Sequence, residues 1–440
     1  MKLLGIYCTL VTAGLLVLGC DSGTEEPIDT TVVVVHAAPG YETLDFLRVE
    51  RVEASLPFRG STTLDFDADT YTFNIEISLP GANAPLRIRS FSADITANRD
   101  HIIVLAQVGS VIEPLVSSKE EFDRSSAESE FLIIHAAAGV AAFDVYVETE
   151  GTDPASSTPR GSVGFETELA PVTIAPGGYT LILTEVGNPS NILFTSSAQA
   201  LVAGVTDVFI VTGNGNEGLA AFSVVQLGSG SAILPDSNLQ SGIRVLNTAA
   251  DKSARDIVID SNFATPLIAA LPFATQSNYE LVAGGLREIT VTPAGNTGVL
   301  EIEQTSSVTE GLLYTLLLSS NDNGLATAFS LDNRRSLLNL STLKILNGAG
   351  QFSSLEFFVL PIGMNIDTAV PLASFGAPGV SPGTTILPDS YELVIRDSVT
   401  QTTVSGPQTI TLGVGGVYGI LAVDGADATT ADVVLLDDFN

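Results

Sequence analysis

The chain repeats one short pattern four times, and this repetition constrains its fold more than any other feature. Each copy is an apolar, largely β-branched run that ends in His or Asn, and an Asp or Glu follows nine positions later. The pairs are His36 with Asp45, His135 with Asp144, Asn247 with Asp256, and Asn347 with Glu356. Successive copies lie 99, 112 and 100 residues apart. Because four chance matches at a constant inner spacing are improbable, the pattern predicts four tandem domains of ordinary size.

The rest of each copy has the pattern of β-structure. Short β-branched or aromatic runs alternate with Gly, Pro, Asn and Asp, and no long run keeps a period of 3.6 residues. We expect closing hairpins such as Leu312–Ser319 with Ala326–Leu331. We also expect a Tyr or Leu that follows a turn to pack at the sandwich edge, namely Tyr71, Tyr179, Leu286 and Tyr391. The chain is therefore predicted to be all-β, as four sandwiches arranged like beads on a string; the alternative is a four-bladed propeller.

The domain boundaries are predicted from polar stretches. The expected divisions are a signal peptide at 1–19, a flexible tether at 20–31, sandwiches at 32–124, 129–228, 242–334 and 341–440, and a linker at 229–241. The stretch 332–341 is short, which favours packing of the last two sandwiches against each other.

The N-terminus has the features of a signal peptide. Lys2 precedes an apolar stretch that is too short to span a membrane stably, and the stretch ends in Val17-Leu18-Gly19-Cys20. This ending resembles the bacterial lipobox. The resemblance implies cleavage before Cys20 and acylation of its sulfur, which would anchor the protein to lipid; the alternative is an ordinary secretory signal with a chance Cys. Cys8 would be removed with the signal, so no disulfide is expected. The expected location is the cell envelope, with the inner or outer membrane and the periplasmic or outer face left open.

The net charge limits the partners. Fifty acidic and 18 basic side chains give a formal charge of −32, which disfavours binding to nucleic acid. The expected partners are the membrane, through the N-terminal lipid, and a protein or a glycan. We expect no cofactor.

The repeat pattern is similar to a known bacterial module. The openings Val-His-Ala-Ala-Pro at 35–39 and Ile-His-Ala-Ala at 134–137 precede Leu44-Asp45-Phe46 and Phe143-Asp144-Val145-Tyr146. Together with Ala175-Pro176-Gly177-Gly178-Tyr179, they resemble the domain-of-unknown-function family 4397, whose members are secreted bacterial proteins, often in tandem and with lipoprotein signals. The last two copies match in part, because Asn replaces His. The resemblance implies immunoglobulin-like β-sandwich domains at a cell surface and no established activity.

The His and Asp of the first two copies invite a catalytic interpretation, since a carboxylate can orient an imidazole as a general base. Asn247 and Asn347 cannot act as bases, but they can form the hydrogen bonds that His forms. A structural role at the end of the first strand therefore explains all four copies, and we expect no catalytic residues and no enzyme.

Three other patterns resemble functional sites. Asp65, Asp67 and Asp69 alternate as in a calcium loop, but the loop's Gly and distal Glu are missing, so a strand with a solvated acidic face is expected there. A second acidic cluster lies near the C-terminus. We expect no metal ion at either pattern. The C-terminal cluster is Asp424, Asp427, Asp432, Asp437 and Asp438. The glycines of 213–218 match a dinucleotide-binding spacing, but a strand rather than a helix follows, so they are expected to form a hairpin turn.

The sequence thus favours a lipid-anchored envelope protein with a non-enzymatic scaffold, adhesion or binding role. One alternative is a periplasmic small-ligand binder or hydrolase that uses the His-bearing repeats. Another is an adhesin made rigid by calcium.

Overall fold

The protein is described by a computed structural model that covers residues 30–321 and 324–437. The predicted signal peptide, Cys20, most of the tether and Asp438 lie outside the described residues. The described part consists of β-strands and two single turns of 3₁₀-helix, η1 (Pro154–Ser156) and η2 (Ile366–Thr368). None of its helices is long and apolar enough to cross a membrane.

The first unit, residues 30–120, is a sandwich of two four-stranded sheets with the orders β4-β1-β7-β8 and β3-β2-β5-β6. Its strands are β1 (Thr30–His36), β2 (Thr43–Arg48), β3 (Arg51–Pro57), β4 (Ser61–Phe66), β5 (Asp69–Ile77), β6 (Leu86–Ile95), β7 (Arg99–Val108) and β8 (Val111–Glu120).

The second unit, residues 129–234, repeats this plan with the sheets β12-β9-β16-β17-β18 and β11-β10-β13-β14, and β15 pairs with β13. Its strands are β9 (Ser129–His135), β10 (Phe143–Glu148), β11 (Gly161–Val163), β12 (Glu168–Ile174), β13 (Gly177–Glu185), β14 (Asn188–Thr195), β15 (Gln199–Leu201), β16 (Thr206–Gly213), β17 (Phe222–Leu227) and β18 (Ala232–Leu234).

The third unit, residues 241–332, has the sheets β22-β19-β26-β27 and β21-β20-β24-β25, and β23 also pairs with β19. Its strands are β19 (Ser241–Thr248), β20 (Arg255–Ile259), β21 (Ile268–Leu271), β22 (Thr275–Gln276), β23 (Glu280–Val282), β24 (Gly285–Pro293), β25 (Ile302–Val308), β26 (Leu313–Asn321) and β27 (Gly324–Asp332).

The fourth unit, residues 341–437, has the sheets β31-β28-β35-β36 and β30-β29-β33-β34, and β32 also pairs with β28. Its strands are β28 (Ser341–Asn347), β29 (Leu355–Pro361), β30 (Ala373–Phe375), β31 (Gly379–Val380), β32 (Thr384–Ile386), β33 (Ser390–Asp397), β34 (Thr403–Thr411), β35 (Val417–Asp424) and β36 (Ala431–Asp437).

All four units share one strand order, which confirms the prediction of repeated all-β sandwiches. The first strand of each unit runs parallel to the first strand of the closing hairpin, as β1 does beside β7 and β28 beside β35, and it is antiparallel to its other neighbours. The second strand lies in the opposite sheet. Each unit therefore has the two-layer architecture of a β-sandwich, with a connection between the layers after the first strand.

Alternation along the strands places one apolar core inside each sandwich. In β1, for example, Val32 and Val34 face the core of the first unit, and Leu44 and Phe46 of β2 meet them from the other sheet. The other three units have equivalent cores.

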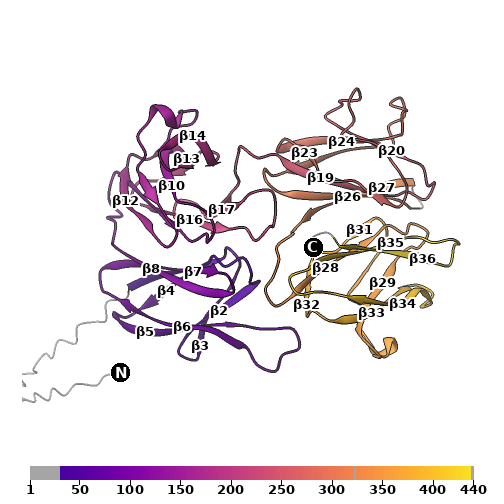
Figure 1. The fold of residues 1–440 in the computed structure, drawn as a ribbon, viewed down its shortest axis with the longest axis horizontal. Coiled ribbons are helices and arrows are strands. Elements are labelled where there is room, and N and C mark those ends of the chain that lie inside the picture. The colour runs from indigo at the N-terminus through magenta and orange to yellow at the C-terminus, as the bar shows by residue number, and fades with distance from the viewer. Residues whose placement is uncertain (1–29, 322–323, 438–440) are drawn as a thin grey trace, which may run out of the picture.

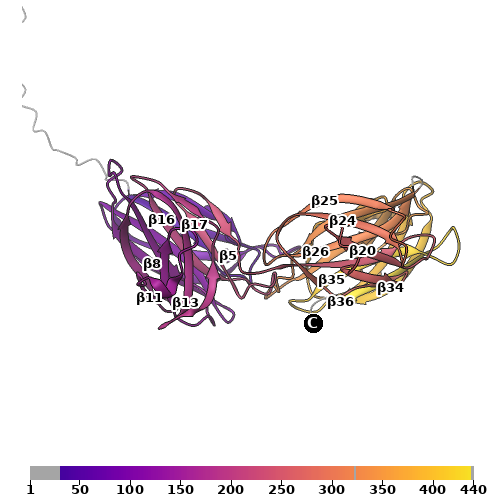
Figure 2. The same cartoon turned by 90° about the horizontal axis from the view of Figure 1, so that it is seen from above.

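The sandwiches also pack against each other in two pairs, which contradicts the beads-on-a-string arrangement. An apolar cluster joins units 1 and 2 through the outer faces of β1, β7, β9 and β16, and it includes Val35, Val104, Ile134 and Ile210. A second cluster joins units 3 and 4. The result is a two-by-two arrangement in which units 1 and 2 form one lobe and units 3 and 4 the other (Figures 1 and 2).

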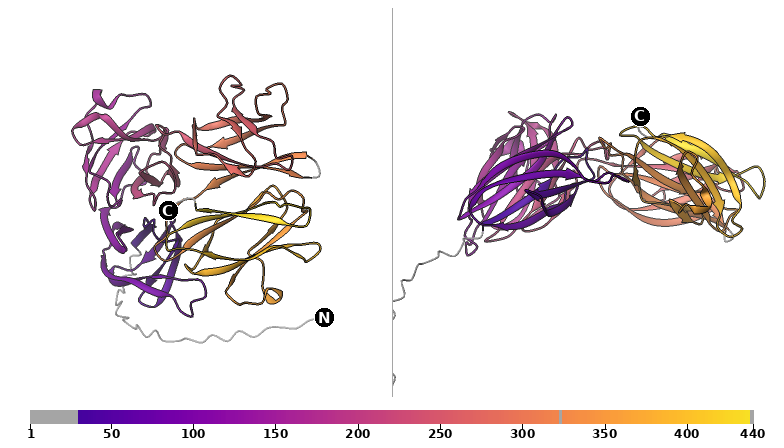
Figure 3. Two further views of the ribbon diagram at one scale, coloured as in Figure 1. Left: turned by 45° about the vertical axis from the view of Figure 1, so that its right-hand side comes forward. Right: turned by 90° about the horizontal axis from the view of Figure 1, so that it is seen from below.

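The segment that connects units 3 and 4 also links the two lobes. The amide of Leu338 donates to the carbonyl of Gly40 in unit 1 (2.9 Å), and that of Ser336 donates to Gly215 in unit 2 (3.2 Å). The side chain of Leu338 packs against the core of unit 1. Residues 333–340, which we call the strap, thus run between the lobes, where Figure 3 shows the connecting loops.

Two local predictions were wrong. The expected linker at 229–241 contains β18, which pairs with β17 and places Leu234 in the core of unit 2, because Leu234 is apolar and Ala232 and Ile233 can continue the sheet.

Leu286 does not pack at a sandwich edge: it is 72% exposed. Tyr71, Tyr179 and Tyr391 each donate a hydroxyl hydrogen bond to a carbonyl four residues earlier. Leucine has no hydroxyl to donate, and Arg287 makes the equivalent bond to Ala283 instead.

Candidate functional site

The His or Asn of each repeat makes the same bond in all four units. All four side chains are fully buried at the end of the first strand. His36 Nδ1 accepts from the amide of the residue two positions later at 3.1 Å, and His135 Nδ1 does so at 3.3 Å. The Oδ1 atoms of Asn247 and Asn347 accept from the equivalent amides at 3.2 and 3.1 Å. His and Asn both have a hydrogen-bond acceptor close to the backbone, so Asn can replace His here.

The other polar atom of these side chains is a donor in three of the units. His135 Nε2 lies 3.4 Å from the carbonyl of Ala141. Asn247 Nδ2 donates to Ser253 (3.0 Å) and Leu271 (2.9 Å), and Asn347 Nδ2 donates to Phe375 (2.8 Å). These side chains therefore tie the end of the first strand to neighbouring loops.

Burial keeps both histidines neutral. It lowers the pKa of His36 to about 3, with a further lowering from the positive charge of Arg335. Burial also lowers the pKa of His135. Since Nδ1 accepts a hydrogen bond in each ring, the proton of the neutral form lies on Nε2.

The acidic partners lie on the other side of the second sheet. The second strand alternates, so Phe143 and Val145 face the core while Asp144 points outward, away from His135. Asp144 accepts from the amide of Gly187 (2.8 Å) and from the hydroxyl of Ser162.

The same placement holds in the other units. Asp256 accepts from the amides of Ala270 (2.7 Å) and Gly295 (2.8 Å). Asp45 accepts from Ser55, and Glu356 from Gln401. Each His or Asn is therefore close to its acid in the sequence but not in the fold, and the two side chains form no catalytic dyad.

Three carboxylates of the two acidic patterns accept hydrogen bonds from backbone amides. Asp69 accepts from the amide of Thr70 (2.7 Å), and Asp427 from that of Thr429 (2.8 Å). Asp424 accepts from the amide of Gln351 (3.0 Å), and burial raises its pKa. Within residues 30–321 and 324–437, no three His, Cys, Asp or Glu side chains are grouped as a metal site. Gly213 ends β16, Gly215 and Gly218 lie in the loop between β16 and β17, and a strand rather than a helix follows.

The strap brings together charged residues that the sequence analysis did not single out. Arg335 donates to the carbonyls of Tyr41 (2.7 Å) and Pro39 (3.1 Å), and its guanidinium lies 4.6 Å from the ring centroid of Phe58. Burial lowers the pKa of Arg335 to about 10, although the charge of Glu217 opposes the shift. Arg59 covers the same ring and pairs with Glu217. Arg335 therefore attaches the strap to unit 1 through buried, charge-assisted bonds.

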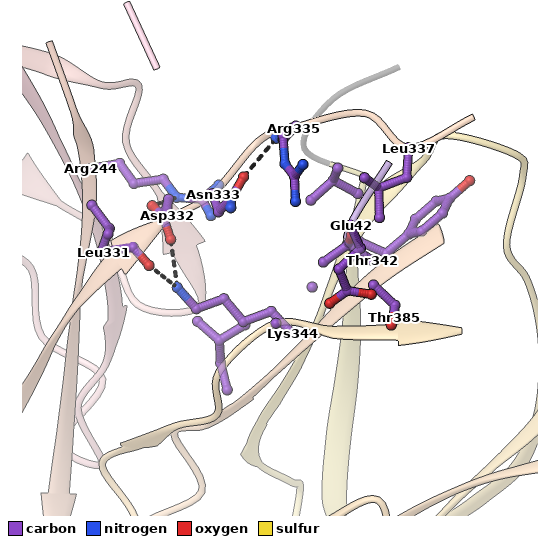
Figure 4. A pocket seen from close by; sticks show the side chains of 15 residues that line it. Glu42, Arg244, Leu331, Asp332, Asn333, Arg335, Leu337, Thr342, Lys344 and Thr385 are labelled. Atoms are coloured by element: carbon purple, nitrogen blue, oxygen red, sulfur yellow. Dashed lines mark hydrogen bonds and ion pairs between the residues drawn. The ribbon is translucent and has the colours of Figure 1, made fainter. Parts of the chain in front are cut away.

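Asp332 is the centre of a second charged group, at the junction of units 3 and 4 (Figure 4). It is buried, it lies 2.7 Å from Lys344 Nζ, and its other oxygen accepts from Tyr279 at 2.8 Å. Arg244 lies 3.6 Å away. Asp332, Lys344 and Arg244 line a pocket of about 150 Å³ beside Glu42 and Arg335. One sequence signal was available: Arg244 and Lys344 interrupt first strands that are otherwise apolar.

Comparison with known proteins assigns no family. No family model matches the chain, and neither does any curated protein. Among solved structures, the Bacillus anthracis TIE protein is similar over 91% of this chain and 69% of its own, at 9% identity and a TM-score of 0.15. Such a score carries no argument about fold or function.

Proposed function

We propose that this chain is a lipid-anchored cell-envelope protein whose four sandwiches serve a non-enzymatic scaffold, adhesion or binding role. One observation carries the non-enzymatic part: the repeated His or Asn accepts the same backbone hydrogen bond in all four units, and its acidic partner points away from it. The most reactive groups of the repeats are thus used to hold loops in place.

The arrangement of the units supports a role in presenting surfaces. Two apolar interfaces and the strap hold the four sandwiches together, so that their end loops and outer sheet faces keep fixed positions. The lipobox-like ending at Cys20 supports attachment to a membrane, and the resemblance to family 4397 supports exposure at a cell surface.

Anchoring is tested by metabolic labelling with an alkyne-bearing palmitate in a bacterium that has the lipoprotein pathway. The wild-type chain should take up label and partition into the detergent phase of a Triton X-114 extraction. Cys20→Ser should lose both properties, while Cys8→Ser should keep them because that residue leaves with the signal. Label retained in Cys20→Ser would contradict the proposed anchor.

The non-enzymatic role is tested with His36→Asn and His135→Asn in the same chain. Cells that display the wild type or the double variant are compared for adhesion to immobilised envelope glycans and matrix proteins. Equal adhesion above that of cells without the protein is the expected result, since Asn keeps the backbone bond. A selective loss of adhesion in a folded double variant would favour the alternative in which the His-bearing repeats form the binding site.

A further inference from the structure

A cavity lies where the two lobes meet, away from the repeat signature. Its volume is about 250 Å³, and it is lined by residues of unit 2 and unit 3 together with Arg59 of unit 1. The amide of Leu219 donates to the carbonyl of Gly311 across this junction (2.8 Å). A Cβ on Gly218 would lie only 2.3 Å from the same carbonyl oxygen. The two loops therefore pack in direct backbone contact, and the cavity is built into the junction.

Much of the cavity wall is apolar. Phe222 and Leu234 are buried, and Leu312 lines the wall from unit 3. Ile233 is 51% exposed and Leu331 is 50% exposed. An apolar cavity at a junction between domains, with a few polar groups in it, is the usual form of a small-molecule site.

Most charges around the cavity already have partners. Arg59 donates to Glu217 and, at 2.7 Å, to Ser223. Asp332 is held by Lys344 and Tyr279. The charges of these residues are therefore already engaged within the protein.

Two carboxylates differ from the rest. Asp236 is nine-tenths buried, and the bonds it accepts, from the amides of Thr195 and Asn238 (both 3.1 Å) and from Asn238 Nδ2 (3.0 Å), all go to Oδ1. Burial raises the pKa of Asp236. Glu310 is half-buried, its carboxylate lies where a side chain on Gly284 would be, and within the described part of the chain neither a hydrogen bond nor an ion pair to it is found. Within the described part of the chain neither carboxylate has a cationic partner, so a positive ligand would stabilise the charged form of both groups.

We propose that this cavity binds a small organic cation, with its ammonium group between Asp236 and Glu310 and its hydrocarbon part against Phe222, Leu234 and Leu312. The site is independent of the proposed envelope role. The formal charge of −32 would add long-range attraction for such a ligand.

The test is a calorimetric titration of the chain from Asp21 onward with three compounds of similar shape. Phenethylamine supplies the cation, phenylpropanol the neutral analogue and phenylpropionate the anion. Phenethylamine should bind to one site, at least about tenfold more tightly than either analogue. Equal affinity for all three compounds would overturn the proposal.

Matched variants locate the site. Glu310→Gln and Asp236→Asn should each weaken phenethylamine binding by about tenfold, while Glu303→Gln, which removes an equal charge from an exposed position of the same unit, should leave it within about twofold. Ala220→Phe should block the cavity without changing any charge. Equal weakening by Glu303→Gln and Glu310→Gln would show general attraction to an acidic surface and would overturn the proposal. Circular dichroism confirms that each variant is folded.

Discussion

The two pair interfaces are built on the same strands but differ in chemistry. Between units 1 and 2, the position three residues before the repeated His holds Val33 or Leu132, and the described interface has eleven buried apolar residues. Between units 3 and 4, the same position before the repeated Asn holds Arg244 or Lys344, and six buried apolar residues form the cluster. Asp332 forms ion pairs with both basic side chains there.

This difference shows that the same sheet-on-sheet interface can be stabilised in two ways, by apolar contacts or by buried ion pairs. A continuous apolar run in a first strand buries both faces of the strand and stabilises the pair by the hydrophobic effect. A basic residue in that run is paired here with the buried carboxylate of Asp332, which belongs to the same unit as Arg244 and to the unit that neighbours Lys344. The second solution gives specificity at the cost of desolvating three charges.

The largest expected effect comes from charging the apolar interface. Ile210→Asp places an unpaired carboxylate between units 1 and 2 and should lower the free energy of unfolding of that pair by roughly 4 kcal/mol or more. Differential scanning calorimetry should show the transition of the first pair shifted down or lost. Val186→Asp in the same unit, where the valine is 48% exposed, should have little effect. Similar losses from both variants would contradict an interface at Ile210.

The charged interface should break when its carboxylate is removed. Asp332→Asn removes the carboxylate that Arg244 and Lys344 share and should cost about 3 kcal/mol of unfolding free energy in the second pair. Urea unfolding measures this cost. A double variant with Lys344→Met should recover part of the stability, and failure to recover any would argue against the pairing.

A smaller effect is expected at the edge of the first interface. Lys119 of unit 1 is buried and lies 2.8 Å from Asp100 and 2.9 Å from Glu130 of unit 2. Lys119→Met should cost roughly 1–3 kcal/mol, since it leaves Glu130 without its cation while keeping the apolar stem. Arg51→Met, at a side chain that is 73% exposed, is the matched control and should cost under about 0.5 kcal/mol. Equal costs for the two variants would show that the bridge between units 1 and 2 adds nothing.

At neutral pH the smallest effect is expected at His36, and this effect should grow as the pH falls. The pKa of His36 falls from its ordinary 6.5 to about 3 in the folded chain. The unfolded chain therefore takes up a proton first, and stability that is complete above pH 6.5 is lost as the pH falls toward 3. His36→Asn should change stability by under about 1 kcal/mol at pH 7.

Below pH 6.5, wild type should lose up to about 1.4 kcal/mol per pH unit relative to the Asn variant. Urea titrations at several pH values test this difference. Parallel pH curves for the two proteins would contradict a buried neutral His36.

The sequence predicts the repeated features well and the contacts between repeats poorly. Periodicity and constant spacing indicate four sandwiches, and the exchange of His36 for Asn247 already indicates a structural hydrogen bond. The apolar run Val32–Val35 also indicates a strand that is buried on both faces. An arrangement of separate sandwiches does not explain such burial.

The lobe junction is different. It depends on where loops from three units meet in space, and neither Arg335 nor Asp236 has a local pattern that marks it. The same holds for β18, whose three residues are too few to establish a period.

The strap has a consequence for how the molecule is made. Arg335 bonds to Tyr41, 294 residues earlier in the chain. At ordinary rates of translation, a ribosome needs roughly 15–60 s to synthesise that interval. A first sandwich that folds before the strap is made therefore lacks Leu338 at its core, and the early and late halves of the polypeptide can lock together only after the third sandwich has been synthesised.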